Sequence, residues 1–362
     1  MAAAPHPLTH PPMQRGWIDA LHRQCALGDL ALDNGDCIRD FVVSYVVHGP
    51  DEPGVPTALG LCAIGSTHHR LDFLIGPGAP LDTNRMRVIV VDAIGNGLTT
   101  SPSTSLRQPG MAFPGFTIGD MVRSQKLLLE RLGVERLEVV IGASMGGMQA
   151  LEWGVRYPEA MARIVALVPL ARTPGWTAAI NHAARQALAG ALNRGASTAP
   201  AAPWPPCTWD AWVTVMQLLA VRTPAKVNDE IAGPQALPAW LAERTAWWTG
   251  QGFDPIDWIY QSRAYDAHNV GHAPGFDGNT ARALQSIRAR TLIVAAALDL
   301  YNPGACAQWA AAEIPGCRCV TYDSPWGHML ASAADGATAP LLGAEIRQFL
   351  GATDQTTGGD TA

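Results

Sequence analysis

A five-residue run, Gly142-Ala143-Ser144-Met145-Gly146, fits the G-x-S-x-G pattern of serine nucleophiles. The apolar stretch 137–142 leads into it as a predicted strand, and a helix-like stretch, 147–157, leads out of it and ends before a proline. A serine on such a turn presents its hydroxyl above the carboxyl edge of a sheet. We therefore expect Ser144 to be a nucleophile and the backbone N–H of Met145 to stabilise a developing oxyanion.

A serine hydroxyl is a weak nucleophile that needs a base and an acid to orient that base. In folds with this motif the order along the chain is serine, acid, histidine. Asp299 follows the apolar stretch 291–296, and His328 follows the stretch 319–322. Both fall at the ends of predicted strands, where ligands meet open α/β sheets. We predict that Asp299 is the acid and His328 the base; Asp323 is the competing acid.

The other histidines fit this order less well. His68 and His69 follow the first predicted strand, where they either line a pocket or are exposed. The rest lie in a later insertion (His182, His268, His272) or too early in the chain (His6, His10, His22, His48).

The second oxyanion donor should come from the loop after the strand predicted at 57–64. Ile64 is the candidate for this backbone N–H, with Gly65 and Ser66 as alternatives. A plain turn from strand to loop is the competing interpretation of this segment.

Short apolar stretches alternate with helix-like stretches along much of the chain. The predicted strands are 57–64, 87–92, 137–142, 164–169, 291–296 and 319–322, and the predicted helices are 118–132 and 147–157. This alternation predicts an α/β fold with a mostly parallel sheet flanked by helices.

The alternation breaks down between residues 171 and 286, where eight of the twelve tryptophans lie. We interpret 171–286 as a helical lid whose tryptophans line an apolar pocket or build the lid's own core. The catalytic core would then comprise 16–170 and 287–350, and the proline-rich start 1–15 and the small polar end 351–362 would be flexible tails.

Composition excludes several classes of protein. The chain has 362 residues, a net charge of -6 and 48% apolar residues, so it can bury a large core and has no basic run for nucleic acid. Its seven cysteines include no C-x-x-C pair, which suggests neither a disulfide framework nor a zinc site. Without a signal-peptide core or a stretch of about 18 apolar residues, we expect a cytoplasmic protein with no membrane contact.

Several longer strings resemble the homoserine O-acetyltransferase family. The string GASMGGMQALEW at 142–153 is the most specific; others occur at 75–78, 81–83, 113–122, 157–159, 185–187 and 324–328. The resemblance implies the α/β-hydrolase fold, a helical lid, a homodimer joined through the lid, and ping-pong acyl transfer. The serine mechanism itself needs no metal and no organic cofactor, and we expect acetyl-CoA only as a donor substrate, and only if the chain is a transferase.

The chain departs from this family where the amino-acid acceptor would bind. The resemblance places a lid Arg and Tyr at Val215 and Arg222, and an Asp directly after the catalytic histidine, where this chain has Met329. Burying an ammonium group without a partner costs several kcal/mol. We therefore expect a serine carboxylic-ester hydrolase acting on short-chain (acetyl) esters. The alternative is an O-acetyltransferase using acetyl-CoA and homoserine or another alcohol. A non-catalytic binding protein is disfavoured because all three catalytic candidates are present.

Overall fold

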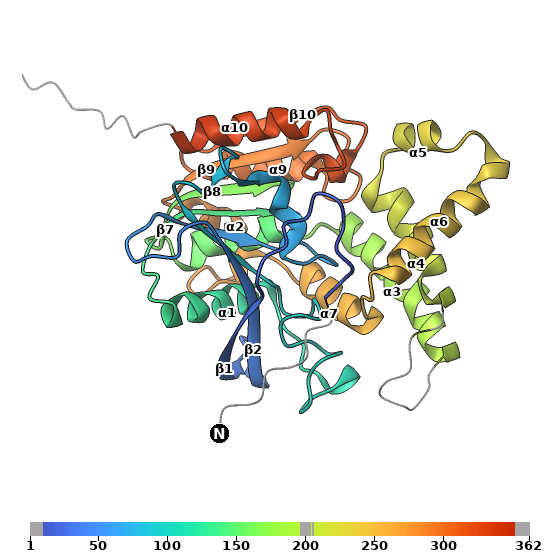
Figure 1. The fold of residues 1–362 in the computed structure, drawn as a ribbon, viewed down its shortest axis with the longest axis horizontal. Helices are drawn as coiled ribbons and strands as arrows, with labels where there is room; N and C mark the ends of the chain where they lie inside the picture. Colours follow the sequence, from blue (N-terminus) through green and yellow to red (C-terminus); the bar gives the residue numbers. More distant parts are fainter. Residues whose placement is uncertain (1–9, 196–203, 205, 352–362) are drawn as a thin grey trace, which may run out of the picture.

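An eight-stranded sheet forms the centre of the computed structural model, which describes residues 10–195, 204 and 206–351 (Figure 1). The strands lie in the order β1-β2-β6-β3-β7-β8-β9-β10. Their bounds are β1 Arg23–Ala31, β2 Cys37–His48, β3 Thr57–Leu61, β6 Arg87–Val91, β7 Leu137–Ala143, β8 Met161–Leu167, β9 Arg290–Ala296 and β10 Arg318–Tyr322. Two short strands, β4 Ile75–Gly76 and β5 Leu81–Asp82, pair separately.

The strands from β6 to β10 in this order are all parallel, whereas β2 pairs antiparallel with both β6 and β1. The α/β-hydrolase-type sheet predicted from the sequence is thus confirmed. The β1–β2 hairpin was not predicted. In β1 the side chains are mostly exposed or partly exposed, so this edge strand lacks the continuous apolar run that marked the central strands.

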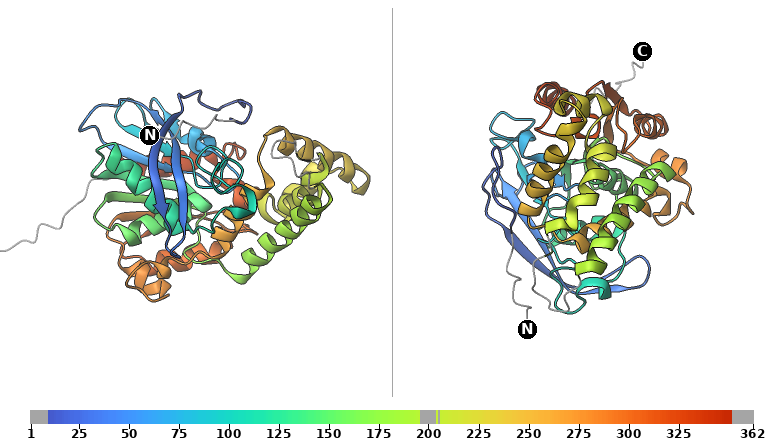
Figure 2. Two further views of the ribbon diagram at one scale, coloured as in Figure 1. Left: turned by 90° about the horizontal axis from the view of Figure 1, so that it is seen from below. Right: turned by 90° about the vertical axis from the view of Figure 1, so that its right-hand side faces the viewer.

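Helices flank the sheet on both sides (Figures 1 and 2). These flanking helices are α1 Ile118–Arg131, α2 Met145–Arg156, α8 Thr280–Gln285, α9 Gly304–Glu313 and α10 Ala339–Gly351, of which α8 falls within the predicted insertion 171–286. A capping box fixes the start of α1: the Thr117 hydroxyl accepts from the Asp120 N–H, and the Asp120 carboxylate accepts from the Thr117 N–H. The helix ends just before Gly133, whose φ of +67° is the conformation of a helix stop.

The part of the chain from α3 to α7, residues 175–266, is mostly helical, and most of it stands to one side of the sheet (Figures 1 and 2). Its helices are α3 Gly175–Gly195, α4 Asp210–Met216, α5 Pro224–Glu230, α6 Leu237–Gly250 and α7 Pro255–Asp266. The Trp212 ring lies against those of Trp209, Trp248 and Trp258, with centroid separations of 5.1, 4.6 and 5.3 Å. These tryptophans therefore form an aromatic cluster inside the helical region, and some of them also line the cavity described below.

Parts of the predicted tails can be compared with the structure. Residues 1–9 and 352–362 lie outside the described residues. His10 and Gln14, from the predicted N-terminal tail, hydrogen-bond to His69 and Gln251, at 2.9 and 2.6 Å. In the part of the chain that the structure describes, no helix has the length and apolarity to cross a bilayer.

Candidate active site

Ser144, His328 and Asp299 come together at the carboxyl ends of β7, β9 and β10, although they are far apart in the sequence. Ser144 Oγ lies 2.8 Å from His328 Nε2, and His328 Nδ1 lies 2.7 Å from Asp299 Oδ2. All three side chains are buried. The separations are those of a proton relay, in which the imidazole can take the serine proton while the carboxylate stabilises the imidazolium.

The Asp299 carboxylate is fixed by the chain that follows it. Its Oδ1 atom accepts hydrogen bonds from the backbone N–H groups of Tyr301 and Asn302, both at 2.8 Å. The Tyr301 ring then packs edge-on against the His328 imidazole, with 5.1 Å between centroids. The turn after β9 thus orients both the acid and the base.

Ser144 occupies a strained turn between β7 and α2. Its φ of +58° lies in the left-handed region that non-glycine residues avoid. Neighbouring glycines make the turn possible, since a Cβ on Gly142 would lie 2.2 Å from the Gly146 carbonyl oxygen and one on Gly146 would lie 2.4 Å from that of Leu61. This is the geometry that the G-x-S-x-G pattern predicts.

Helix α2 begins at Met145, so the N–H of Met145 belongs to the first turn, whose amides lack partners within the helix. On the opposite side lies the loop after β3. The Gly65 N–H donates to Gln261 Oε1 at 3.0 Å and is therefore already engaged. Of the three amides considered in this loop, those of Ile64 and Ser66 have no hydrogen-bond acceptor among the described residues.

The other candidates of the sequence analysis lie elsewhere. Asp323 is exposed, as are His182 and His272. His268 is buried and hydrogen-bonds through Nε2 to the Leu170 carbonyl at 3.1 Å, and burial lowers its pKa to about 3. His69 pairs with Asp72 at 2.7 Å.

Ser144 and His328 face a cavity of about 600 Å³. Four segments line it: 14–17 near the N-terminus, 63–73 after β3, the helical region between β8 and β9, and the loop 326–334 that carries His328. Trp212, Trp248 and Trp258 contribute apolar walls. The cavity is large enough for a small substrate with a leaving group.

Arg70 also lines this cavity and was not singled out from the sequence. No carboxylate pairs with its guanidinium among the residues that the structure describes, and burial lowers the pKa of Arg70 to about 10. An unpaired cation in a partly closed site is costly unless a ligand neutralises it. Arg70 can therefore receive an anionic group, although nothing in its sequence context marks it.

The structure also shows where the residues lie that depart from the family's acceptor-binding pattern. Arg222 lines the cavity but already pairs with Glu230 at 2.9 Å, and Val215 is not among the lining residues. Met329 lines the cavity directly after His328. Only Asp72 and Glu243 bring carboxylates to the described wall, and each has a basic partner, His69 or Arg244.

Comparisons with known proteins agree with this architecture. A model of the alpha/beta hydrolase fold family matches residues 69–202. A homoserine O-acetyltransferase from Trichormus variabilis is 32% identical over 336 residues, which cover 88% of this chain and 91% of that protein. One from Solidesulfovibrio magneticus is 49% identical, but over 122 residues that make up only 31% of its length.

Solved structures show the same fold. An acetylester hydrolase from Corynebacterium glutamicum superposes with a TM-score of 0.82 at 21% identity, covering 92% of this chain and 96% of that one. A homoserine O-acetyltransferase from Bacillus anthracis has a TM-score of 0.78 at 22% identity, covering 92% and 98%. The chain is an enzyme of the α/β-hydrolase fold, and it belongs to the homoserine O-acetyltransferase family.

Proposed function

We propose that the chain is a serine O-acyltransferase that passes a short acyl group to the hydroxyl of a small, carboxylate-bearing alcohol. The observation that carries the proposal is the relay Ser144–His328–Asp299, with separations of 2.8 and 2.7 Å, facing a cavity that also holds the unpaired Arg70. The names of the relatives favour transfer over the hydrolysis expected from the sequence. Acetyl-CoA is the proposed donor.

In the first half-reaction Ser144 Oγ attacks the acyl carbon while His328 Nε2 takes the serine proton. The oxyanion is held by the N–H groups of Met145 and Ile64, each worth about 3 kcal/mol to the transition state. His328 then protonates the departing thiolate, which leaves an ester on Ser144. Throughout this step Asp299 stabilises the charged imidazole.

In the second half-reaction the acceptor hydroxyl attacks the acyl-enzyme. His328 takes the hydroxyl proton and returns it to Ser144 as the product ester leaves. Arg70 is proposed to hold the carboxylate of the acceptor, since charge-assisted hydrogen bonds from Arg to carboxylate are strong and directional. Met329 offers no charge to an ammonium group, which favours acceptors that lack one.

The acceptor can be tested with matched alcohols and acetyl-CoA. We expect 4-hydroxybutyrate, which has a carboxylate but no ammonium, to accelerate CoA release more than homoserine amide or 1,4-butanediol does. Free CoA should be measured by chromatography, because the exposed Cys207 and Cys319 would react with thiol reagents. Ser144→Ala should lower the rate on the order of 10³-fold or more. Wild-type rates in that variant would refute the relay.

Hydrolysis is the second candidate, and Met329 favours it. With Met329 in place of an acidic residue, the described cavity wall lacks the ammonium partner expected for an amino-acid acceptor, so water becomes the simplest nucleophile. A solved esterase is 26% identical, with a TM-score of 0.79 over 92% of this chain. CoA release, or p-nitrophenyl acetate cleavage, that no alcohol in the panel accelerates would establish hydrolysis and reject transfer.

A further inference from the structure

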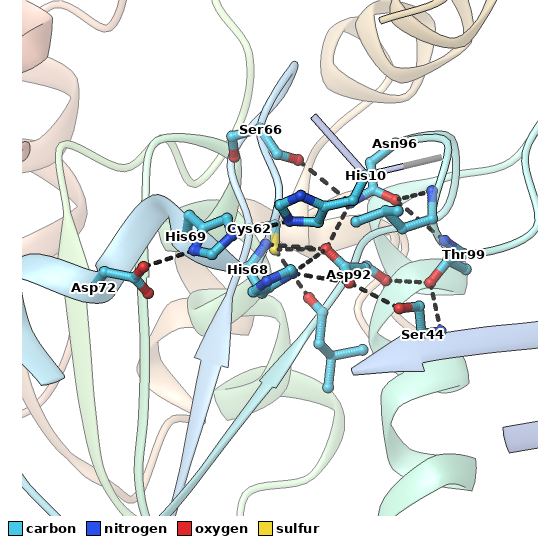
Figure 3. A network of polar contacts seen from close by, with 12 residues as sticks. His10, Ser44, Cys62, Ser66, His68, His69, Asp72, Asp92, Asn96 and Thr99 are labelled. Atoms are coloured by element: carbon cyan, nitrogen blue, oxygen red, sulfur yellow. Dashed lines mark hydrogen bonds and ion pairs between the residues drawn. The ribbon is translucent and has the colours of Figure 1, made fainter. Parts of the chain in front are cut away.

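Three histidines that the relay does not use meet beside the strand ends of the sheet. His10 and His22 lie before β1, and His68 lies in the 3₁₀ helix His68–Leu74 that follows β3. Each offers a ring nitrogen, and these three nitrogens lie within 4.8 Å of one another. Figure 3 shows His10 and His68 on the same side of the network, with His69 next to them.

Two of these imidazoles each carry a buried nitrogen that lacks a hydrogen-bond partner among the described residues. His22 Nδ1 and His68 Nε2 have no hydrogen-bond partner within the described parts of the chain. The His68 side chain is only 1% exposed. Leaving such a group unpaired costs about 1–3 kcal/mol. The rings nevertheless lie in contact, with centroids of His22 and His68 4.4 Å apart.

The environment of His68 is that of a metal ligand. Its Nδ1 atom lies 3.3 Å from both carboxylate oxygens of Asp92, so the Nδ1–H donates to Asp92 and the lone pair falls on Nε2 (Figure 3). Asp92 is held in turn by the Ser44 hydroxyl at 3.0 Å and the Asn96 amide at 2.9 Å. A fixed carboxylate that sets the tautomer of an inward-facing imidazole is the usual outer shell of a zinc site.

The neighbouring His69 repeats this arrangement. Its Nδ1 lies 2.7 Å from Asp72 Oδ2, and its Nε2 lies 2.9 Å from His10 Nε2. His69 therefore lies within hydrogen-bond distance of one member of the three-histidine cluster.

We propose that His10, His22 and His68 bind one divalent late transition-metal ion, Zn²⁺ by preference. Three imidazole nitrogens suit Zn²⁺, which takes nitrogen at about 2.0–2.1 Å in a tetrahedron and leaves the fourth position to water or His69. Ligand nitrogens in that tetrahedron lie about 3.4 Å apart, so nitrogens that lie within 4.8 Å of one another need to approach by no more than about 1.4 Å on binding.

The ion would hold the N-terminal segment 10–22 against the core and would not act on the substrate. None of its three ligands lines the catalytic cavity, but residues 14–17, which lie between His10 and His22 in the chain, do. Binding therefore ties one wall of the cavity to the core helix that carries His68. The metal-site proposal does not depend on which acceptor the enzyme uses, since the ion adds no group to the catalytic relay.

Metal binding tests the proposal directly. The full chain, stripped with a chelator, should take up one equivalent of Zn²⁺ in a competition titration and show a higher Tm when loaded. His22→Gln and His10→Gln should each weaken binding about tenfold or more. The exposed His182→Gln is the matched control and should bind as the wild type does. Circular dichroism of each apo variant separates lost binding from lost folding.

Limited trypsin digestion tests whether Zn²⁺ holds the N-terminal segment in place. Arg15 is exposed and lies between the two N-terminal ligands, so Zn²⁺ should slow cleavage after Arg15 in the wild type and in His182→Gln but not in His22→Gln. A wild-type chain that binds no Zn²⁺, or one whose binding survives both His10→Gln and His22→Gln, would overturn the proposal. Zn²⁺ binding that does not slow cleavage after Arg15 would show that the ion does not hold this segment in place.

Discussion

Asp299 presents one carboxylate oxygen to His328 Nδ1 at 2.7 Å and uses the other to accept two backbone N–H groups. The acid is thereby oriented by its own turn and not by the histidine. An amide in its place can keep both backbone hydrogen bonds through its oxygen while its NH₂ group faces Nδ1. Replacing Asp299 by Asn therefore separates what the carboxylate charge and the His328 tautomer contribute to catalysis from any effect on folding.

Asp299→Asn should lower kcat/KM for acyl transfer or ester cleavage by about 10⁴-fold, because the imidazole is then held in the wrong tautomer. The free energy of unfolding should change little, and urea denaturation checks this. Asp323→Asn, at the exposed competing acid, should leave both quantities unchanged. Comparable losses in the two variants would mean that Asp299 does not orient His328.

Gly146→Ala should destabilise the protein by about 1–3 kcal/mol, since the new Cβ would lie 2.4 Å from the Leu61 carbonyl oxygen of β3. Helix propensity alone predicts the opposite sign, because alanine is preferred over glycine within helices. Gly250→Ala in α6, where nothing lies within 4 Å of a Cβ, is the matched control and should be neutral or stabilising. Urea unfolding of both variants measures the difference. An equally stable Gly146→Ala would show that the contact relaxes.

The central strands and the catalytic residues could be predicted because the sequence features that mark them are local. The central strands are continuous apolar runs, and the serine turn is a short motif whose glycines are required by contacts of 2.2–2.4 Å. Asp299 and His328 could be predicted because the order serine, acid, histidine along the chain, together with a position just after a strand, leaves few candidates. β1 escaped prediction because this edge strand is largely exposed, whereas β2 carries a buried and mostly apolar run at 41–46 that the sequence could have revealed.

The features that escaped prediction depend on tertiary contacts. Arg70 is notable only because no carboxylate within the described residues approaches it, which the sequence cannot reveal. His10 and His22 were set aside as too early in the chain, yet folding brings them to His68. No spacing pattern links these three histidines, and the cysteine spacing that suggested no zinc site carries no information about them.

Arg70→Met should raise KM for carboxylate-bearing acceptors about tenfold or more, since a hydrogen bond to a charged group contributes about 1.5–3 kcal/mol. Neutral alcohols and p-nitrophenyl acetate should react as before. The variant should also have a higher Tm, because it removes a partly buried cation that no carboxylate among the described residues pairs with. Steady-state kinetics with 4-hydroxybutyrate and 1,4-butanediol, together with thermal unfolding, check both effects. Equal changes for the two alcohols would contradict a carboxylate-binding role.

Met329→Asp should shift the acceptor preference towards alcohols that carry an ammonium group. The new carboxylate would lie in the cavity next to His328, where it can pair with the ammonium of homoserine. We expect the ratio of kcat/KM for homoserine to that for 4-hydroxybutyrate to rise about tenfold. Met329→Asn, which has the shape without the charge, should leave the ratio near the wild-type value. A similar ratio in both variants would argue against this position as the ammonium determinant.

His268 should make the protein less stable in acid. Burial lowers its pKa from 6.5 to about 3, so between these values the unfolded chain binds a proton that the native chain does not. The free energy of unfolding therefore falls as the pH drops through this window, by up to about 1.4 kcal/mol per pH unit. Urea denaturation between pH 5 and 7 should show a smaller slope for His268→Gln, whose amide can still donate to the Leu170 carbonyl. His182→Gln, at an exposed position, should keep the wild-type slope. Parallel slopes in all three proteins would mean that His268 is protonated in the native state, in which case its hydrogen bond to Leu170 must compensate for the burial of the charge.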